Sequence, residues 1–321
     1  MRHRLGCIAL ITIVAASLAV WALRLVALQR PLLILAVAIA PGVTLAASLA
    51  LALGCRSVAL GPRLAAVAVV SGLVVFGPGG GLPFGCGNVD AAGPGLVVYS
   101  HNIKVGEGDL AAEEEQIRSA DPDVVMIQEG GLAFIADLEA RLGDTYPHVA
   151  RSRSDKKLAM AVFSRWPLDD VVDTTGLDWT QNPVLVMTVD SPFGLVRLAN
   201  VHLSAPRGRS LAGRWQSEFE TLAVNTDGAD LLVGDFNSSP AHRQFRDLLA
   251  TGYDDAQAEV GCGLGLTWAP LGRGPSLLHL DHVLTRHPLA AQEISVLGRA
   301  GSDHAAILAV VTSASASTPA P

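Results

Sequence analysis

The sequence predicts an α/β domain preceded by about three transmembrane helices, and three observations support this fold class. Only 17% of the 321 residues are charged, below the roughly one quarter that is usual in soluble domains. The deficit is confined to residues 1–89, which contain six arginines and no acidic residue. Beyond residue 95, strand-like and helix-like stretches alternate. These patterns exclude a disordered chain, a fibrous repeat and a single soluble globule.

Residues 1–76 are the predicted transmembrane region, with spans at about residues 5–23, 31–53 and 64–76. A helix needs about 20 apolar residues to cross a bilayer, so the first two runs are long enough and the third is short. The third run can cross by tilting or by using the glycines that follow it. A cleaved signal peptide is the alternative interpretation of the first run.

The arginines predict how these spans are oriented. Four of them lie before the first span or between the second and third, and two lie between the first and second. With the N-terminus inside, the majority is cytoplasmic, as the positive-inside rule requires. We therefore expect a multi-pass protein of the cell membrane whose folded domain is extracytoplasmic.

Residues 77–95 are a predicted flexible linker, because glycine and proline fill 11 of its 19 positions. The folded domain is expected at residues 96–311, and the Ser/Ala/Pro-rich tail at 312–321 is expected to be disordered. Cys86 and Cys262 lie outside the apolar runs. In an oxidising compartment they either form a disulfide or remain two unrelated thiols.

Within the folded domain, short β-branched and apolar runs alternate with stretches of helical periodicity. Strands are expected at residues 96–101, 124–128, 158–164, 184–189, 195–202, 230–233, 280–284, 293–297 and 304–311. Helices are expected at residues 110–120, 132–142, 211–224 and 241–249. Polar residues gather just past the strand ends, where α/β folds place functional groups.

Six short motifs occupy these strand ends. They are Ser-His-Asn at 100–102, Ile-Gln-Glu at 127–129, Asn-Val-His-Leu at 200–203, Gly-Asp-Phe-Asn at 234–237, Leu-Asp-His at 280–282 and Ser-Asp-His at 302–304. Each motif alone is weak, but their order resembles that of the endonuclease/exonuclease/phosphatase superfamily of metal-dependent phosphoesterases. Phe-Ser-Arg at 163–165 and Thr-Trp at 267–268 are lesser matches. The resemblance covers about residues 96–311 and implies a four-layer α/β sandwich, with two packed β-sheets flanked by helices.

The resemblance also implies a divalent-metal site. Glu129 corresponds to the glutamate that binds the metal in this superfamily, and Asn102 and Asp303 are its expected companions. Hard cations favour carboxylate and amide oxygens, so the expected cofactor is Mg²⁺, with Mn²⁺ as the alternative.

Five further residues are predicted to move protons and hold the phosphoryl group. His304 is expected to activate water, with its ring oriented by Asp281. His202 is the candidate acid or phosphate donor on the leaving-group side. Asp235 and Asn237 are expected to hold the water or the phosphoryl group. Parts of the superfamily use the aspartate at position 235 as the base, so the sequence leaves the choice between Asp235 and His304 open.

The charge distribution bears on the substrate. Residues 90–321 carry a net charge of −13, whereas proteins that bind nucleic-acid backbones usually present basic surfaces. Arg207, Arg209 and Arg214 follow His202 and are either solvated loop residues or a phosphate-binding rim. With the predicted anchor, this favours a phosphatase or phosphodiesterase acting on a lipid-linked or small phosphorylated substrate. An extracellular nuclease and an inactive envelope sensor or scaffold are the alternatives.

Overall fold

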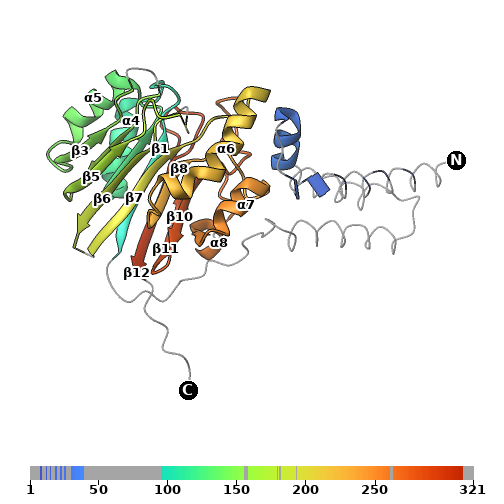
Figure 1. The fold of residues 1–321 in the computed structure, drawn as a ribbon. Coiled ribbons are helices and arrows are strands. Elements are labelled where there is room, and N and C mark those ends of the chain that lie inside the picture. The colour runs from blue at the N-terminus through green and yellow to red at the C-terminus, as the bar shows by residue number, and fades with distance from the viewer. Residues whose placement is uncertain are drawn as a thin grey trace.

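The computed structural model describes residues 95–313, apart from 155–157, 179, 181, 193 and 261–262, together with residues 30–39 and scattered positions before them. Figure 1 shows two β-sheets packed face to face, with helices covering the outer face of each. This is the four-layer α/β sandwich that the family resemblance implied.

The first sheet has the strand order β11-β12-β1-β2-β4-β3. Its central strands β1 and β2 are parallel, and every other neighbouring pair is antiparallel. The strands are β1 (Leu96–Asn102), β2 (Val124–Gln128), β3 (His148–Arg151), β4 (Ala161–Ser164), β11 (Leu289–Val296) and β12 (Ile307–Ser313).

The second sheet repeats this plan, with the order β5-β6-β7-β8-β10-β9 and a parallel central pair formed by β7 and β8. The strands are β5 (Leu168–Asp173), β6 (Leu185–Ser191), β7 (Gly194–His202), β8 (Leu231–Asp235), β9 (Tyr253–Asp255) and β10 (Asp281–Arg286). In each sheet the carboxyl ends of the two parallel strands therefore lie at the same edge.

Three apolar clusters hold the four layers together. The first fills the space between the sheets with Val, Leu, Ile and Met side chains from both inner faces. The second packs α6 (Arg209–Asn225) and α7 (Arg243–Leu249) onto the second sheet, and the third packs α4 (Leu110–Ala120) and α5 (Gly131–Leu142) onto the first. The short helix α8 (Ala256–Val260) follows β9. Burial of these apolar faces is the dominant favourable term in folding.

The sequence-based expectation was incomplete at the sheet edges. It missed β3, β5, β9 and α8. Strand β5 reads Leu-Asp-Asp-Val-Val-Asp and is exposed at four of its six positions, so it lacks the alternation that marks a half-buried strand. Strand β11 contains a bulge between Ala291 and Glu293, which shifts its alternation, and it begins four residues before the expected start.

Near the N-terminus, residues 31–39 form a helix that packs beside α6 and α7 (Figure 1). Ile34 and Val37 are buried in that contact, and the Nε2 atom of His242 lies 3.0 Å from the carbonyl oxygen of Ile34. Among the residues that the structure describes, no helix is long and apolar enough to cross a membrane.

Most of the predicted spans and of the linker 77–95 lie outside the described residues, as do Cys86 and Cys262. The transmembrane topology and the disulfide therefore stay predictions. At the other end of the chain, β12 continues to Ser313, two residues into the predicted tail.

Candidate active site

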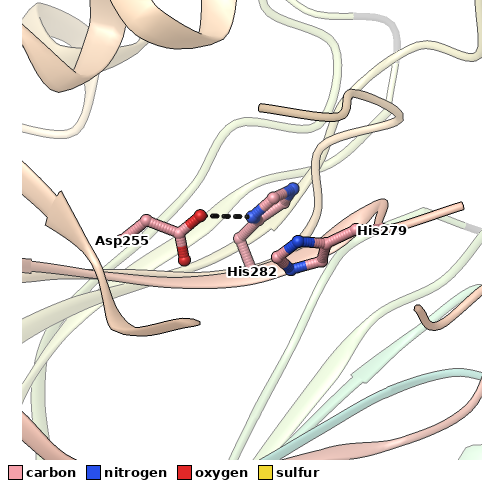
Figure 2. A group of neighbouring side chains, drawn as sticks. All are labelled: Asp255, His279 and His282. Carbon is pink, nitrogen blue, oxygen red and sulfur yellow. Dashed lines mark hydrogen bonds and ion pairs between the residues drawn. The ribbon is translucent and has the colours of Figure 1, made fainter. Parts of the chain in front are cut away.

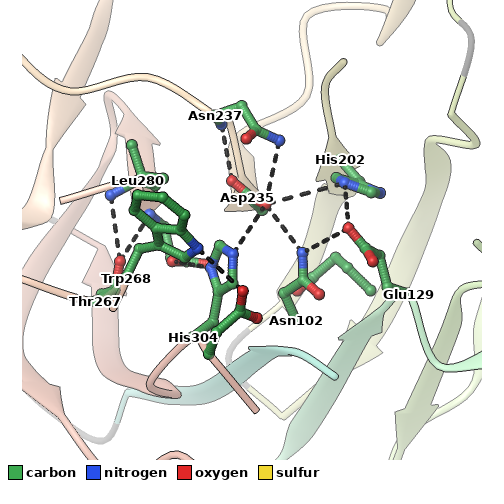
Figure 3. Close-up of polar contacts among 12 residues, drawn as sticks. Asn102, Glu129, His202, Asp235, Asn237, Thr267, Trp268, Leu280 and His304 are labelled. Atoms are coloured by element: carbon green, nitrogen blue, oxygen red, sulfur yellow. Dashed lines mark hydrogen bonds and ion pairs between the residues drawn. The ribbon is translucent and has the colours of Figure 1, made fainter. Parts of the chain in front are cut away.

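Four strand ends and one strand start converge at one edge of the sandwich, and each carries a polar side chain (Figure 3). Asn102 ends β1, Glu129 follows β2, His202 ends β7 and Asp235 ends β8. Asp281 begins β10. The register of the second sheet places Asp235 directly opposite both His202 and Asp281. The local fold therefore gathers the predicted residues because their strands end at the same edge.

Two carboxylates and an imidazole form one side of this site. Glu129 Oε1 lies 3.2 Å from His202 Nε2, and Asp235 Oδ2 lies 3.9 Å from the same nitrogen. The Asn102 amide joins the two carboxylates, since its Nδ2 donates to Asp235 Oδ2 at 2.9 Å and to Glu129 Oε1 at 3.2 Å. Lys104 N donates to Asn102 Oδ1 at 2.9 Å, which fixes the amide in this bridging orientation.

This donor set fits a divalent cation. One ligand atom each from Glu129, His202 and Asp235 lies within 4.8 Å of the others. Burial acts to raise the pKa of Glu129, but hydrogen bonds and charge from His202, with the Asn102 amide, lower it to about 2. Glu129 is therefore an anion at neutral pH, as a hard metal requires. His202 Nδ1 is buried and has no hydrogen-bond partner among the described residues.

Two carboxylates flank an imidazole on the other side of the site. Asp281 Oδ2 lies 2.8 Å from His304 Nδ1, and His304 Nε2 lies 3.7 Å from Asp235 Oδ2. The hydroxyl of Thr267 accepts hydrogen bonds from the backbone amides of Leu280 and Asp281, both at 3.2 Å. The contact that the sequence analysis expected between Asp281 and His304 is present, and their catalytic roles stay predictions.

Burial and neighbouring charges give Asp235 and His304 different protonation states at neutral pH. Burial acts to lower the pKa of His304, but Asp281 and Asp235 raise it to about 10, so this ring is protonated at neutral pH. Burial is also the main reason that the pKa of Asp235 rises to about 6, despite the opposing charge of His304. Asp235 is therefore the group of the pair whose pKa lies near the working range of a general base.

Asn237 and Asp303 occupy different parts of the site. Asn237 adopts a positive φ of 49°, donates from its backbone to Asp235 Oδ1 at 2.8 Å and donates from Nδ2 to the carbonyl of Leu203 at 3.0 Å. Asp303 is half-buried and accepts a 3.3 Å hydrogen bond from Trp268 Nε1. It does not belong to the metal-capable groups found among the described residues, so its role as a ligand stays a prediction.

The structure adds two residues to those expected. Trp268 pairs in a β-bridge with His304, and Ser302 Oγ connects two site segments by donating to the carbonyl of Asn102 at 2.7 Å and accepting from His304 N at 3.1 Å. The only sequence signal for Trp268 was the Thr-Trp pair. Arg207, Arg209 and Arg214 are exposed, and none of them pairs with an acidic side chain among the described residues.

The model of the Endonuclease/Exonuclease/phosphatase family matches residues 99–304, a range that runs from β1 to His304. The chain belongs to this family. Members of the family are metal-dependent phosphoester hydrolases, either nucleases or phosphatases, and the acidic and histidine side chains gathered here suit that chemistry. No curated protein sequence matches the chain.

Solved structures of the family share this fold. A humanised TDP2 from D. rerio superposes with a TM-score of 0.56 at 17% identity, covering 68% of this chain and 99% of that one. The 3' phosphatase NExo from Neisseria, bound to a product DNA hairpin, gives 0.53 at 21% identity, covering 67% and 98%. A family protein from Beutenbergia cavernae gives 0.53 at 19% identity, covering 70% and 73%.

A buried contact between His101 and Glu113 lies next to His304. His101 Nδ1 lies 2.7 Å from Glu113 Oε2, and its Nε2 lies 3.1 Å from the carbonyl oxygen of His304. Burial acts to lower the pKa of His101, but Glu113 raises it above its ordinary value. Tyr99 donates to the second oxygen of Glu113 at 2.9 Å. The contacts of His101 are those of a structural residue.

Replacing Glu113 should destabilise the fold. Glu113→Gln removes the carboxylate that contacts the buried His101 and Tyr99 side chains, and leaving a buried polar group without its partner costs about 2 kcal/mol. The free energy of unfolding, measured by urea titration with tryptophan fluorescence, should fall by that amount. Glu115→Gln on the exposed side of α4 is the control and should unfold like the wild type. Equal stability of both variants would mean that the contact between His101 and Glu113 contributes nothing to stability.

A second buried group, formed by Asp255, His279 and His282, lies outside the active site (Figure 2). His282 Nδ1 lies 3.2 Å from Asp255 Oδ2, and its Nε2 lies 2.9 Å from the carbonyl of Ser238. The His279 ring stacks on His282 with centroids 4.0 Å apart and planes 28° apart. Ring nitrogens direct their lone pairs in the ring plane, so stacked rings do not converge on one ion. We interpret this group as core packing.

The lowered pKa of His279 predicts that the protein loses stability in acid. Burial, together with the neighbouring His282, lowers the pKa of His279 to about 3. Below about pH 6.5 the unfolded chain binds a proton that the folded chain excludes until about pH 3, so stability falls across that window. One such proton costs about 1.4 kcal/mol per pH unit. Urea unfolding at pH 7, 5 and 4 should show a shallower decline for His279→Gln, whereas the exposed control His287→Gln should follow the wild type.

Proposed function

We propose that this chain is a membrane-anchored, divalent-metal-dependent phosphoesterase that hydrolyses a lipid-linked or small phosphorylated substrate outside the cytoplasm. The observation that carries the hydrolytic part is one cluster in which His202 lies 3.2 Å from Glu129 and Asp235 lies 3.9 Å from His202 and 3.7 Å from His304. The carboxylates of Glu129 and Asp235 thereby lie beside the protonated ring of His304. Phosphoester hydrolysis needs this combination to neutralise phosphoryl oxygens and orient a water molecule.

The metal would be held by Glu129, and Asn102 and Asp303 would complete its surroundings, which leaves Asp235 and His202 available for proton transfer. When bound, Mg²⁺ or Mn²⁺ supplies a Lewis acid that polarises the phosphoryl group and stabilises its developing charge. The Asn102 amide donates hydrogen bonds to the Glu129 and Asp235 carboxylates and so holds them in place before substrate binds. The carboxylates therefore need no rearrangement during the reaction.

Asp235 is the better candidate for the base, because its pKa of about 6 leaves it ionised and able to accept a proton at neutral pH. His304 is protonated, with its Nδ1 held by Asp281, so its Nε2 can donate to a phosphoryl oxygen. His202 lies across Asp235 from His304 and would donate to the leaving oxygen. Each of the three groups thus has its own role: Asp235 accepts a proton, His304 donates to a phosphoryl oxygen, and His202 donates to the leaving oxygen.

The substrate assignment depends on charge and on the predicted anchor. Residues 90–321, with a net charge of −13, repel a nucleic-acid backbone, whereas a membrane anchor raises the local concentration of lipid phosphates. The full chain in detergent should be assayed on a prenyl diphosphate, phosphatidic acid, bis-p-nitrophenyl phosphate, single-stranded DNA and duplex DNA. Each assay should be run with Mg²⁺, with Mn²⁺ and with a chelator. Cleavage limited to DNA would contradict the lipid proposal.

A nuclease is the second candidate. One structural neighbour is described as D. rerio TDP2 complexed with a single-strand DNA product, and NExo as bound to a DNA hairpin. A nuclease would cleave DNA at low salt and lose affinity steeply as salt rises, because phosphate contacts release counterions. The same substrate panel, repeated at two salt concentrations, separates the candidates.

The location outside the cytoplasm can be tested by topology reporters. A phosphatase reporter that folds only outside the cytoplasm should be active when fused after Val311, since the arginine distribution orients three spans with the domain outside. A fluorescent reporter that matures only in the cytoplasm should be dark at the same position. The reverse pattern would overturn the orientation.

A further inference from the structure

A hairpin stands at the rim of the active site. Trp268 and Leu278 pair in a β-bridge, and Leu277 N donates to the Trp268 carbonyl at 2.7 Å. The hairpin is fixed to the Ser-Asp-His segment, because Ala269 N donates to the Asp303 carbonyl at 2.8 Å and Trp268 Nε1 donates to the Asp303 carboxylate. Figure 3 shows the Trp268 ring beside the cluster around Asp235 and His304. The position of the tip is therefore tied to the catalytic residues.

The tip of this hairpin, residues 270–277, is apolar and basic. It reads Pro-Leu-Gly-Arg-Gly-Pro-Ser-Leu and contains no acidic residue. Leu271 is 80% exposed and Leu277 is 55% exposed. Arg273 is exposed and pairs with no acidic side chain among the described residues. Two large apolar side chains at one exposed tip are unusual, since such residues are normally exposed singly.

A further cation lies beside this tip. A Cβ atom built on Gly272 would lie 3.9 Å from both Lys104 Nζ and the Cβ of Asp303. Lys104 also pairs with Glu107 at 3.0 Å, but this is an exposed pair of the kind that contributes little. The rim therefore combines exposed leucines with two cations, Lys104 and Arg273, next to the carboxylates of Glu107 and Asp303.

We propose that this tip contacts lipid, with Leu271 and Leu277 entering the head-group region of the bilayer and Lys104 and Arg273 contacting lipid phosphates. The inference rests on the proposed lipid substrate, which it deepens by naming how the phosphate reaches the site. An apolar tip flanked by cations matches the layering of a membrane, in which anionic phosphates lie above hydrocarbon. A nucleic acid would match the cations but leave the leucines exposed.

The predicted tether allows this orientation. The folded domain begins at the start of β1, whereas the site lies at the end of β1. Seven strand residues span about 23 Å. The 19 residues of the predicted linker can extend to about 60 Å, so an anchored domain can turn its site towards the bilayer.

The contact can be measured without any assay of activity. Leu271→Trp and the control Leu195→Trp each add one tryptophan, and Leu195 is 70% exposed at the start of β7, the end opposite the site. The full-length variants should be placed in nanodiscs containing anionic lipid, with and without brominated acyl chains. Brominated lipid should quench about half or more of the fluorescence added at position 271 and none of that at 195. Equal quenching at both positions, or none at 271, would overturn the proposal.

A second measurement connects the contact to catalysis. In the variant Leu271→Ser/Leu277→Ser, the ratio of turnover on a prenyl diphosphate in nanodiscs to turnover on soluble bis-p-nitrophenyl phosphate should fall about tenfold, equivalent to about 1.4 kcal/mol. Leu195→Ser should leave this ratio unchanged. An equal loss on both substrates would overturn the proposal, since the tip would then act only on site geometry. If the wild type cleaves no lipid substrate, the proposed function fails, while the quenching experiment still decides the contact.

Discussion

Glu129→Gln should abolish metal-dependent hydrolysis while leaving the protein folded. Gln keeps the shape of the side chain but removes the charge that a hard cation requires, and a pKa of about 2 shows how strongly this position favours the anion. Losing one preorganised electrostatic group typically costs about 10²–10³-fold in turnover, and we expect at least the upper value for a metal ligand. Steady-state kinetics across a Mg²⁺ titration, with Mn²⁺ binding followed by calorimetry, measures both parts of the effect.

Glu115→Gln is the matched control, because Glu115 is an exposed glutamate on α4, outside the site. It should behave like the wild type in both measurements. Asp303→Asn belongs in the same series, since the Asp303 carboxylate contacts Trp268 and its role as a ligand rests on the family resemblance. If Glu129→Gln kept near-normal turnover and metal affinity, the ligand assignment would be wrong.

Asp235→Asn should remove the ascending acid limb of the pH–rate profile. Asp235 is ionised above its pKa of about 6, so a base at this position makes the rate rise as pH increases towards neutrality. The loss at neutral pH should be about 10²–10⁴-fold. His304→Ala should also slow the reaction but keep that limb. If instead His304→Ala removed the limb and Asp235→Asn kept it, His304 would be the base.

Asp281 and His304 should act as one unit. Their hydrogen bond of 2.8 Å holds the ring, so Asp281→Asn should cost nearly as much as His304→Ala. Because the effects of such units are strongly non-additive, the double variant should be little worse than His304→Ala alone. Multiplicative losses would show that the two residues act independently. Asp235→Asn, Asp281→Asn, His304→Ala and the double variant should be compared on one substrate across pH.

Much of the fold is encoded in local patterns. Helix α4 and strand β2 have the boundaries that the sequence predicts, because Asp109 caps the helix and five consecutive apolar or buried residues form the strand. The edge strand β5 was missed because exposed aspartates interrupt its apolar pattern, and its pairing with β6 is visible only in the folded sheet. Local patterns therefore predict buried elements better than exposed ones.

For the site, the sequence by itself determined which residue types follow which strands, and their order was enough to indicate the family. The tertiary structure decided how they meet. Antiparallel pairing of β10 with β8 places Asp281 opposite Asp235, although 46 positions separate them, and the Asn102 amide bridges two carboxylates from different sheets. The pKa values of Asp235 and His304 follow from the burial and charge created by that assembly. Strand order and register arise from packing across the whole chain, so no local pattern encodes them.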